Sequence, residues 1–251
     1  ADYNLMSAAQ RSALTALSPI ILDLDGNGVS TTSASDGVNF DLAASGVAGR
    51  YGWVNSTDAL LVRDVNGDGV INDGRELFGS ATKLDNGQDA GHGYAALAQL
   101  DSNQDGRVNS SDQKFGELKL WVDADHDGLT DIGELRGLVE MGVVSLDLNY
   151  ATSTRMDNGN AVAMVSGYQS ADGLTHEMAD VWFAKARTEE PPQIADLLAA
   201  PAADLTAQLP PAPATPAPEA AAATAPEPTA VSAGLRSTME EDLLRHRNTL
   251  I

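Results

Sequence analysis

The sequence predicts an α+β fold, in which short antiparallel strands at both ends surround a paired EF-hand-like helical centre. Three observations support this prediction. Short apolar runs bounded by Gly, Asp and Asn occupy residues 19–63 and 143–184, as is typical of strands joined by turns. Helix-like segments lie between these regions, beside loops rich in Asp and Gly. Ten of the 11 prolines fall between Pro191 and Pro228 among many alanines, which indicates a disordered Pro/Ala-rich linker.

The expected elements follow one another along the chain. An apolar run opens at Pro19, and the sequence Asp157-Asn158-Gly159 provides a hairpin turn between two later runs. The expected strands cover residues 19–24, 38–42, 51–55, 59–63, 118–122, 143–150, 161–168 and 177–184. The expected helices cover residues 92–100, 111–118 and 133–141.

These elements divide the chain into four parts. Residues 1–17 form a lead-in, 18–187 the folded module, 188–233 the linker, and 234–251 an amphipathic helix or a frayed tail. The chain shows no signal peptide and no run of about 18 apolar residues, so we expect no transmembrane helix.

The chain is strongly acidic, with a formal net charge of -21 from 36 acidic and 15 basic residues. This charge argues against a nucleic acid partner, because phosphate binding needs clustered Lys and Arg. The acids cluster between glycines, so bound cations explain them better than a dispersed acidic surface does. The sequence has no cysteine, no histidine cluster that suits zinc, and no GxSxG, P-loop or HExxH motif. We therefore expect a monomer whose partners are calcium ions.

The best calcium-loop match is DADHDGLTDIGE, residues 123–134. Calcium takes 6–8 oxygen ligands, and an EF-hand loop supplies them from positions 1, 3, 5, 7, 9 and 12. Gly128 occupies position 6, where the sharp turn needs a positive φ. The predicted ligands are Asp123, Asp125, Asp127, the carbonyl of Leu129, Asp131 and Glu134.

A second loop, DSNQDGRVNSSD, covers residues 101–112 and has a shorter carboxylate at position 12. Its predicted ligands are Asp101, Asn103, Asp105, the carbonyl of Arg107, Asn109 and Asp112. Because helix candidates flank both loops, we expect 101–112 and 123–134 to form a paired EF-hand.

Two further loops fit less completely. In DVNGDGVINDGRE, residues 64–76, Arg75 holds position 12, and a one-residue bulge would bring the next carboxylate into place; an Asx-rich turn is the alternative. The predicted ligands there are Asp64, Asn66, Asp68, the carbonyl of Val70 and Glu76. The loop DLDGNGV, residues 23–29, offers Asp23, Asp25 and Asn27. It has no nearby closing acid, so either a distant residue or water completes it, or it is a purely structural turn.

Several stretches resemble the self-processing module of RTX-type, FrpC-like secreted proteins of Gram-negative bacteria. They are SPIILDLDGNGV, LLVRDVNGDGVINDGRELFG, HGYAALAQLDSNQDGRVN, LWVDADHDGLTDIGELR and VVSLDLNY. The resemblance implies type I secretion and folding when calcium is met outside the cell. It also implies calcium-triggered cleavage of an Asp-Pro bond at the start of the module, after which the new terminal Asp is joined to a lysine.

The sequence departs from this family at the scissile bond, because Ser18 precedes Pro19. An Asp carboxylate that attacks its own carbonyl closes a five-membered anhydride, whereas Ser would close a strained four-membered lactone. We therefore expect a calcium-folded module without self-cleavage. Two alternatives stay open. One is autocatalytic cleavage at or next to Ser18–Pro19, including an N-to-O shift at Leu17–Ser18 for which the sequence shows no clear base. The other is an adhesion or docking module.

Overall fold

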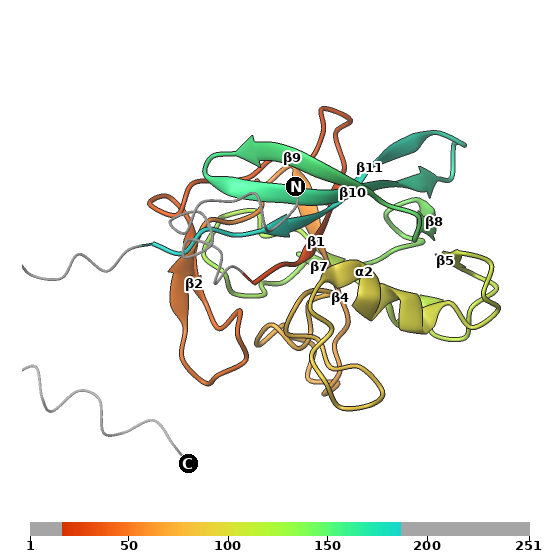
Figure 1. The fold of residues 1–251 in the computed structure, drawn as a ribbon, viewed down its shortest axis with the longest axis horizontal. Helices are drawn as coiled ribbons and strands as arrows, with labels where there is room; N and C mark the ends of the chain where they lie inside the picture. The colour runs from red at the N-terminus through yellow and green to blue at the C-terminus, as the bar shows by residue number, and fades with distance from the viewer. Residues whose placement is uncertain (1–16, 187–251) are drawn as a thin grey trace, which may run out of the picture. The chain divides into compact units, whose positions relative to one another are not determined.

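The protein is described by a computed structural model that covers residues 17–186 (Figure 1). Nearly all of the predicted lead-in, and the whole of the predicted linker and C-terminal tail, lie outside the described residues. The predicted strands are largely confirmed, but the predicted α+β class is wrong, because the described chain is mostly β.

One antiparallel sheet of nine strands organises the described residues. Its order is β5-β8-β10-β11-β1-β4-β6-β7, and β9 also pairs with β10. The strands are β1 (Ile20–Asp23), β4 (Asp58–Val62), β5 (Arg107–Asn109), β6 (Lys119–Trp121), β7 (Leu135–Gly137), β8 (Val143–Asp147), β9 (Ala151–Asp157), β10 (Asn160–Ser170) and β11 (Thr175–Trp182). A separate hairpin joins β2 (Val38–Phe40) to β3 (Gly49–Tyr51).

The predicted EF-hand-like helical centre is also wrong. Only the first expected helix forms, as α2 (Gly93–Leu97) followed by the 3-10 turn η2 (Ala98–Leu100). Residues 111–118 form turns and one short 3-10 segment, η3 (Phe115–Glu117), because so short a stretch gains little from helical hydrogen bonds. Residues 133–141 contain β7, since glycines with φ of +94° and +76° at positions 133 and 142 interrupt a helix and β6 offers a pairing edge.

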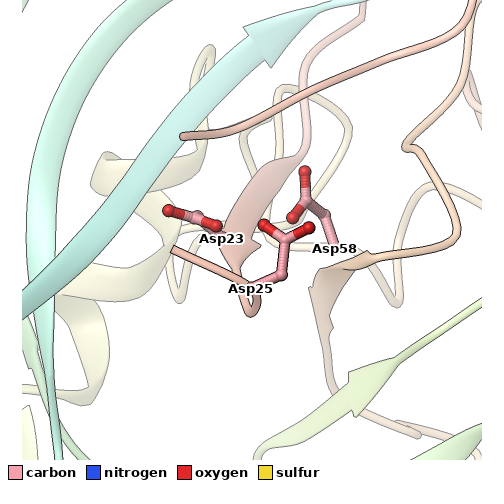
Figure 2. A group of neighbouring side chains, drawn as sticks. All are labelled: Asp23, Asp25 and Asp58. Carbon is pink, nitrogen blue, oxygen red and sulfur yellow. The ribbon is translucent and has the colours of Figure 1, made fainter. Parts of the chain in front are cut away.

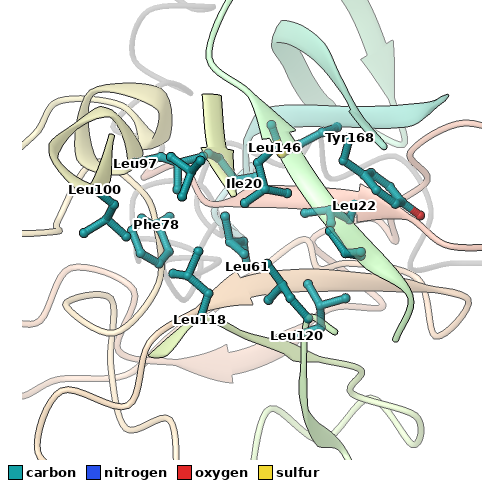
Figure 3. Close-up of a cluster of buried hydrophobic side chains, with 14 of the residues drawn as sticks. Ile20, Leu22, Leu61, Phe78, Leu97, Leu100, Leu118, Leu120, Leu146 and Tyr168 are labelled. Atoms are coloured by element: carbon teal, nitrogen blue, oxygen red, sulfur yellow. The ribbon is translucent and has the colours of Figure 1, made fainter. Parts of the chain in front are cut away.

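The central strands β1 and β4 are buried on both faces, and successive residues of each strand point to opposite sides. On one face, Ile20, Leu22 and Leu61 belong to one apolar cluster with residues of α2 and η2, part of which Figure 3 shows. On the other face, Ile21 and Leu60 pack against a second apolar cluster. Burying each large aliphatic side chain contributes about 1.5–3 kcal/mol, so the two clusters fix the central strands firmly.

The second cluster is built around aromatic rings. Trp53 lies 5.3 Å from Phe40, 5.7 Å from Trp121 and 5.5 Å from Phe183, measured between ring centroids. Both of these tryptophans are fully buried. Their indole N–H groups lie where β6 ends and an acidic loop begins, so this core positions the loop described next.

Candidate metal centre

The loop at residues 123–134 joins β6 to β7 and folds around the carboxylate of Asp123. Asp123 Oδ1 accepts a hydrogen bond from the backbone N–H of Asp127 (3.2 Å), and Oδ2 accepts one from Gly128 (3.0 Å). The indole N–H of Trp53 also donates to Oδ2, at 2.7 Å. Asp123 is fully buried, and this burial raises its pKa. Three hydrogen-bond donors therefore fix the orientation of the Asp123 carboxylate, which is the first predicted ligand of the loop.

The carboxylate of Glu134 closes the same loop. Its Oε1 accepts from the N–H of Ala124 (2.8 Å), and its Oε2 accepts from the N–H of Asp131 (3.1 Å) and from the Trp121 indole (3.3 Å). Oxygens of Asp123, Asp125 and Glu134 lie within 4.8 Å of one another. Asp125 forms a second such group with Asp127 and Asp131. The carboxylates of five of the six predicted ligands thus fall into two close groups that share Asp125.

The loop at residues 101–112 repeats this arrangement. Asp101 Oδ2 accepts from the N–H of Gly106 (2.9 Å). Asp112 accepts from the N–H of Ser102 (2.8 Å) and of Asn109 (2.9 Å), so the shorter closing side chain still reaches both donors. Two of the other predicted side-chain ligands, Asn103 and Asp105, interact directly, with Nδ2 and Oδ2 3.0 Å apart. The third, Asn109, accepts from the N–H of Ser111 through Oδ1 at 2.9 Å.

The loop at residues 64–76 contains the expected extra residue. Asp64 accepts from the N–H of Gly67 (2.7 Å) and Gly69 (2.9 Å). Glu76, the thirteenth residue, accepts from the N–H of Val65 (3.1 Å) and Asn72 (2.8 Å), as Glu134 does in its own loop. The residue at position 12 turns away: the Arg75 guanidinium pairs with Asp73 and lowers the pKa of that carboxyl.

The loop at residues 23–29 is closed by Asp58, which the sequence reading missed. Asp23 accepts from the N–H of Gly26 (2.8 Å) and Gly28 (2.9 Å). Asp58, the first residue of β4, lies opposite Asp23 in the sheet and accepts from the N–H of Leu24 (3.4 Å) and Ser30 (2.8 Å).

Figure 2 shows the carboxyl groups of Asp23, Asp25 and Asp58 together, with oxygens within 4.8 Å of one another. Burial raises the pKa of Asp58 to about 6. The local signal for this residue is an acid that begins the otherwise apolar stretch DALLV. Only the pairing of β1 with β4 shows which loop it closes.

The expected pairing of loops 101–112 and 123–134 is wrong. Within the first of these loops, β5 pairs with β8 at one end of the sheet, whereas β6 and β7 lie at the other end. Loop 123–134 instead contacts loop 64–76, where the N–H of Ile71 donates to Thr130 Oγ1 at 3.0 Å. Loop 123–134 connects β6 to β7, and loop 64–76 follows β4 and ends at Leu77, which bridges back to Val62. The sheet therefore positions both loops instead of a helix pair.

The segment that matches the family's scissile bond lies beside β1. The N–H of Ser18 donates to Ser80 Oγ, and the carbonyl of Ser18 accepts from the N–H of Ser80, both at 2.9 Å. Pro19 forms an antiparallel bridge with Gly79, whose α-carbon approaches so closely that an added Cβ would lie 1.6 Å from the Ser18 carbonyl oxygen. Ser18 and Pro19 are both buried.

Fold and loops together define a class of protein, an antiparallel β module whose acidic clusters are able to hold metal ions. Residues 20–184 match the SPM domain, and the chain belongs to this family. It is 46% identical over 169 residues to the iron-regulated protein FrpA of Neisseria meningitidis serogroup C. The match covers 66% of this chain and 15% of that relative, so kinship with FrpC-like proteins is confirmed for this one module. Among the described residues, no helix is both long and apolar enough to cross a membrane.

Proposed function

We propose that this chain is a calcium-binding module of a secreted RTX-type bacterial protein and that it folds when it binds calcium. One observation carries the proposal: the four acidic loops share one hydrogen-bond plan. In each loop, the first Asp accepts from the N–H of the glycine at position 6, and a second carboxylate accepts from the N–H at position 2. The closing carboxylates are Glu134, Asp112, Glu76 and Asp58.

The donor set favours calcium over softer metals. The side chains that converge in the two clustered loops supply only carboxylate oxygens, and calcium takes 6–8 oxygen ligands in flexible geometry. Extracellular calcium modules bind with dissociation constants of about 10⁻⁴–10⁻³ M, which suits loops as exposed as 64–76 and 101–112. Calcium, when bound, would neutralise the acidic charge of a loop, and the predicted Asp, Asn and Glu side chains of that loop would hold it.

Calcium is also expected to drive folding. The chain carries a net charge of -21, and two of its loops, 23–29 and 123–134, bring like charges to within 4.8 Å. Because the ion binds the folded loops and not the separated carboxylates, its binding free energy adds to the free energy of folding. The calcium-free chain is then unfolded or only loosely packed.

We also propose secretion through a type I system, and kinship with the FrpC-like family supports this route. The module would stay loosely folded where calcium is scarce and fold outside the cell. Cleavage of the Ser18–Pro19 bond by the family's route does not operate, because Ser cannot form the five-membered anhydride.

Circular dichroism in EDTA, followed by millimolar calcium, tests the proposal on the full chain. The far-ultraviolet spectrum should gain β-sheet signal on calcium addition, and equimolar magnesium should produce little change. Asp123→Asn should raise the calcium concentration needed. The matched control is Asp41→Asn, because Asp41 also caps a turn, through Ser45 and Gly46, but belongs to no acidic group. An unchanged spectrum, fully folded in EDTA, would overturn the proposal.

A further inference from the structure

Three buried polar groups without a hydrogen-bond partner meet beside the start of β1. They are Ser18 Oγ, Asp180 Oδ1 and Trp182 Nε1. Ser18 is 2% exposed and Asp180 is completely buried. Because Ile20 pairs with Asp180, the side chains of Ser18 and Asp180 lie on the same face of the sheet. Both Ser18 and Trp182 lie close enough to the Asp180 carboxyl to lower its pKa.

The Asp180 carboxyl is suited to proton transfer. Its Oδ2 accepts from the N–H of Gly93, which fixes the orientation of the group, and Oδ1 is left facing Ser18 and Trp182. Burial raises the pKa of Asp180 to about 7, near the value that general acid–base catalysis favours at neutral pH. The Ser18 hydroxyl and the Trp182 indole N–H both approach this carboxyl as hydrogen-bond donors without reaching full hydrogen-bond geometry, so the hydroxyl proton of Ser18 already faces the proposed base.

The peptide bond before Ser18 has the contacts that an acyl shift needs. The carbonyl of Leu17 accepts from the N–H of Phe183 (3.3 Å), a donor able to stabilise negative charge on that oxygen. On the other side of the bond, the N–H of Ser18 donates to Ser80 Oγ (2.9 Å), which therefore lies beside the nitrogen that would leave.

We propose that Ser18 is the nucleophile and Asp180 the general base of an N-to-O acyl shift at the Leu17–Ser18 bond. The Asp180 carboxylate takes the hydroxyl proton, and Ser18 Oγ forms a bond to the carbonyl carbon of Leu17. The C–N bond between Leu17 and Ser18 then breaks, and the amine nitrogen takes the proton back from Asp180. The product is an ester of Leu17 on the Ser18 side chain, with a free amine on Ser18. Water then adds across the ester bond and releases residues 1–17 from residues 18–251.

This reaction differs from the cleavage that Ser18–Pro19 cannot undergo, since it breaks the bond on the other side of Ser18. It rests on the proposed function only in that the module must be folded for Ser18 and Asp180 to meet. Asp180 is the base that the sequence alone did not reveal.

Intact mass spectrometry of the full chain in calcium, with and without hydroxylamine, tests the proposal. Hydroxylamine attacks esters, so cleavage before Ser18 should accelerate and leave a hydroxamate on Leu17. Ser18→Ala should abolish cleavage, and Asp180→Asn should slow it about 100-fold or more. Ser18→Cys should cleave faster, because a thiol is a better nucleophile.

Thr32→Ala is the matched control, because Thr32 Oγ1 is the other buried hydroxyl without a partner in the part of the chain described. It should cleave at the rate of the unchanged protein. A single 26.1 kDa species after prolonged incubation with hydroxylamine, cleavage at another bond, or an undiminished rate for Asp180→Asn would each overturn the proposal. Circular dichroism of the same samples shows whether calcium has folded them, so failure of the proposed function is recognised separately.

Discussion

Replacing Asp58 by Asn should have opposite effects with and without calcium. Without calcium, two unit charges at a separation of 4.8 Å, the upper limit within this acidic group, repel by about 3.5 kcal/mol at an effective dielectric constant of about 20. Asp58→Asn removes this repulsion from Asp23 and Asp25 while keeping the size of the side chain. With calcium, loss of a buried compensating charge costs about 3 kcal/mol, which corresponds to roughly 100-fold weaker binding at that site.

Circular dichroism in EDTA and thermal unfolding in millimolar calcium measure the two effects. In EDTA, where the unchanged protein is unfolded or loosely packed, the Asp58→Asn variant should show as much β-sheet signal or more. In calcium, the variant should melt at a lower temperature than the unchanged protein. Asp41→Asn, which alters an ordinary turn cap, should leave the gain in stability from calcium unchanged. An Asp58→Asn variant with an undiminished gain from calcium would refute the reasoning, because Asp58 would then be only a structural cap.

Three further predictions concern other positions. Because Glu76 closes its loop, Glu76→Gln should lower the calcium affinity of one site about 100-fold in calorimetric titration. Arg75→Ala should change the calcium affinity of the same site less than about twofold. Asp180 has a pKa of about 7 when folded against 3.8 as its ordinary value, so its contribution to stability is complete below about pH 4 and is lost as pH rises to 7. We expect the free energy of unfolding, measured with urea at saturating calcium, to fall by about 4 kcal/mol more across that pH range in the unchanged protein than in Asp180→Asn. Parallel plots of this free energy against pH for the two proteins would contradict the prediction. Gly79→Ala should lower the free energy of unfolding by about 3 kcal/mol or more, because the added Cβ would lie 1.6 Å from the Ser18 carbonyl oxygen. A decrease below about 1 kcal/mol would show that the segment around Ser18 moves freely.

The sequence predicts the local parts of this molecule well. Each acidic loop takes most of its polar groups from a single short stretch, so their spacing alone indicates which side chains converge. The bulge that brings Glu76 into place was predictable for the same reason. The strands were predictable because their apolar runs end at Gly and Asp, as β1 and β4 show.

The parts that depend on strand pairing were not predictable. Asp58 meets Asp23 only because β1 pairs with β4, and Asp180 meets Ser18 only because β1 also pairs with β11. No local pattern specifies which strands become neighbours. The helical centre was overpredicted because EF-hand loops usually lie between helices, whereas loop 123–134 lies in a β-hairpin whose strands bury Trp121.

The central claim is that calcium orders the loops and, through them, the core. Trp53 and Trp121 report this directly, because their indole N–H groups donate to Asp123 and Glu134 at 2.7 and 3.3 Å. The measurement is a two-dimensional ¹H–¹⁵N spectrum of the indole N–H groups of the full chain, in EDTA and then in millimolar calcium. We predict overlapped signals typical of an unfolded chain in EDTA, and dispersed signals for these two indoles once calcium is added. Signals that are already dispersed in EDTA and do not move on calcium addition would contradict the account.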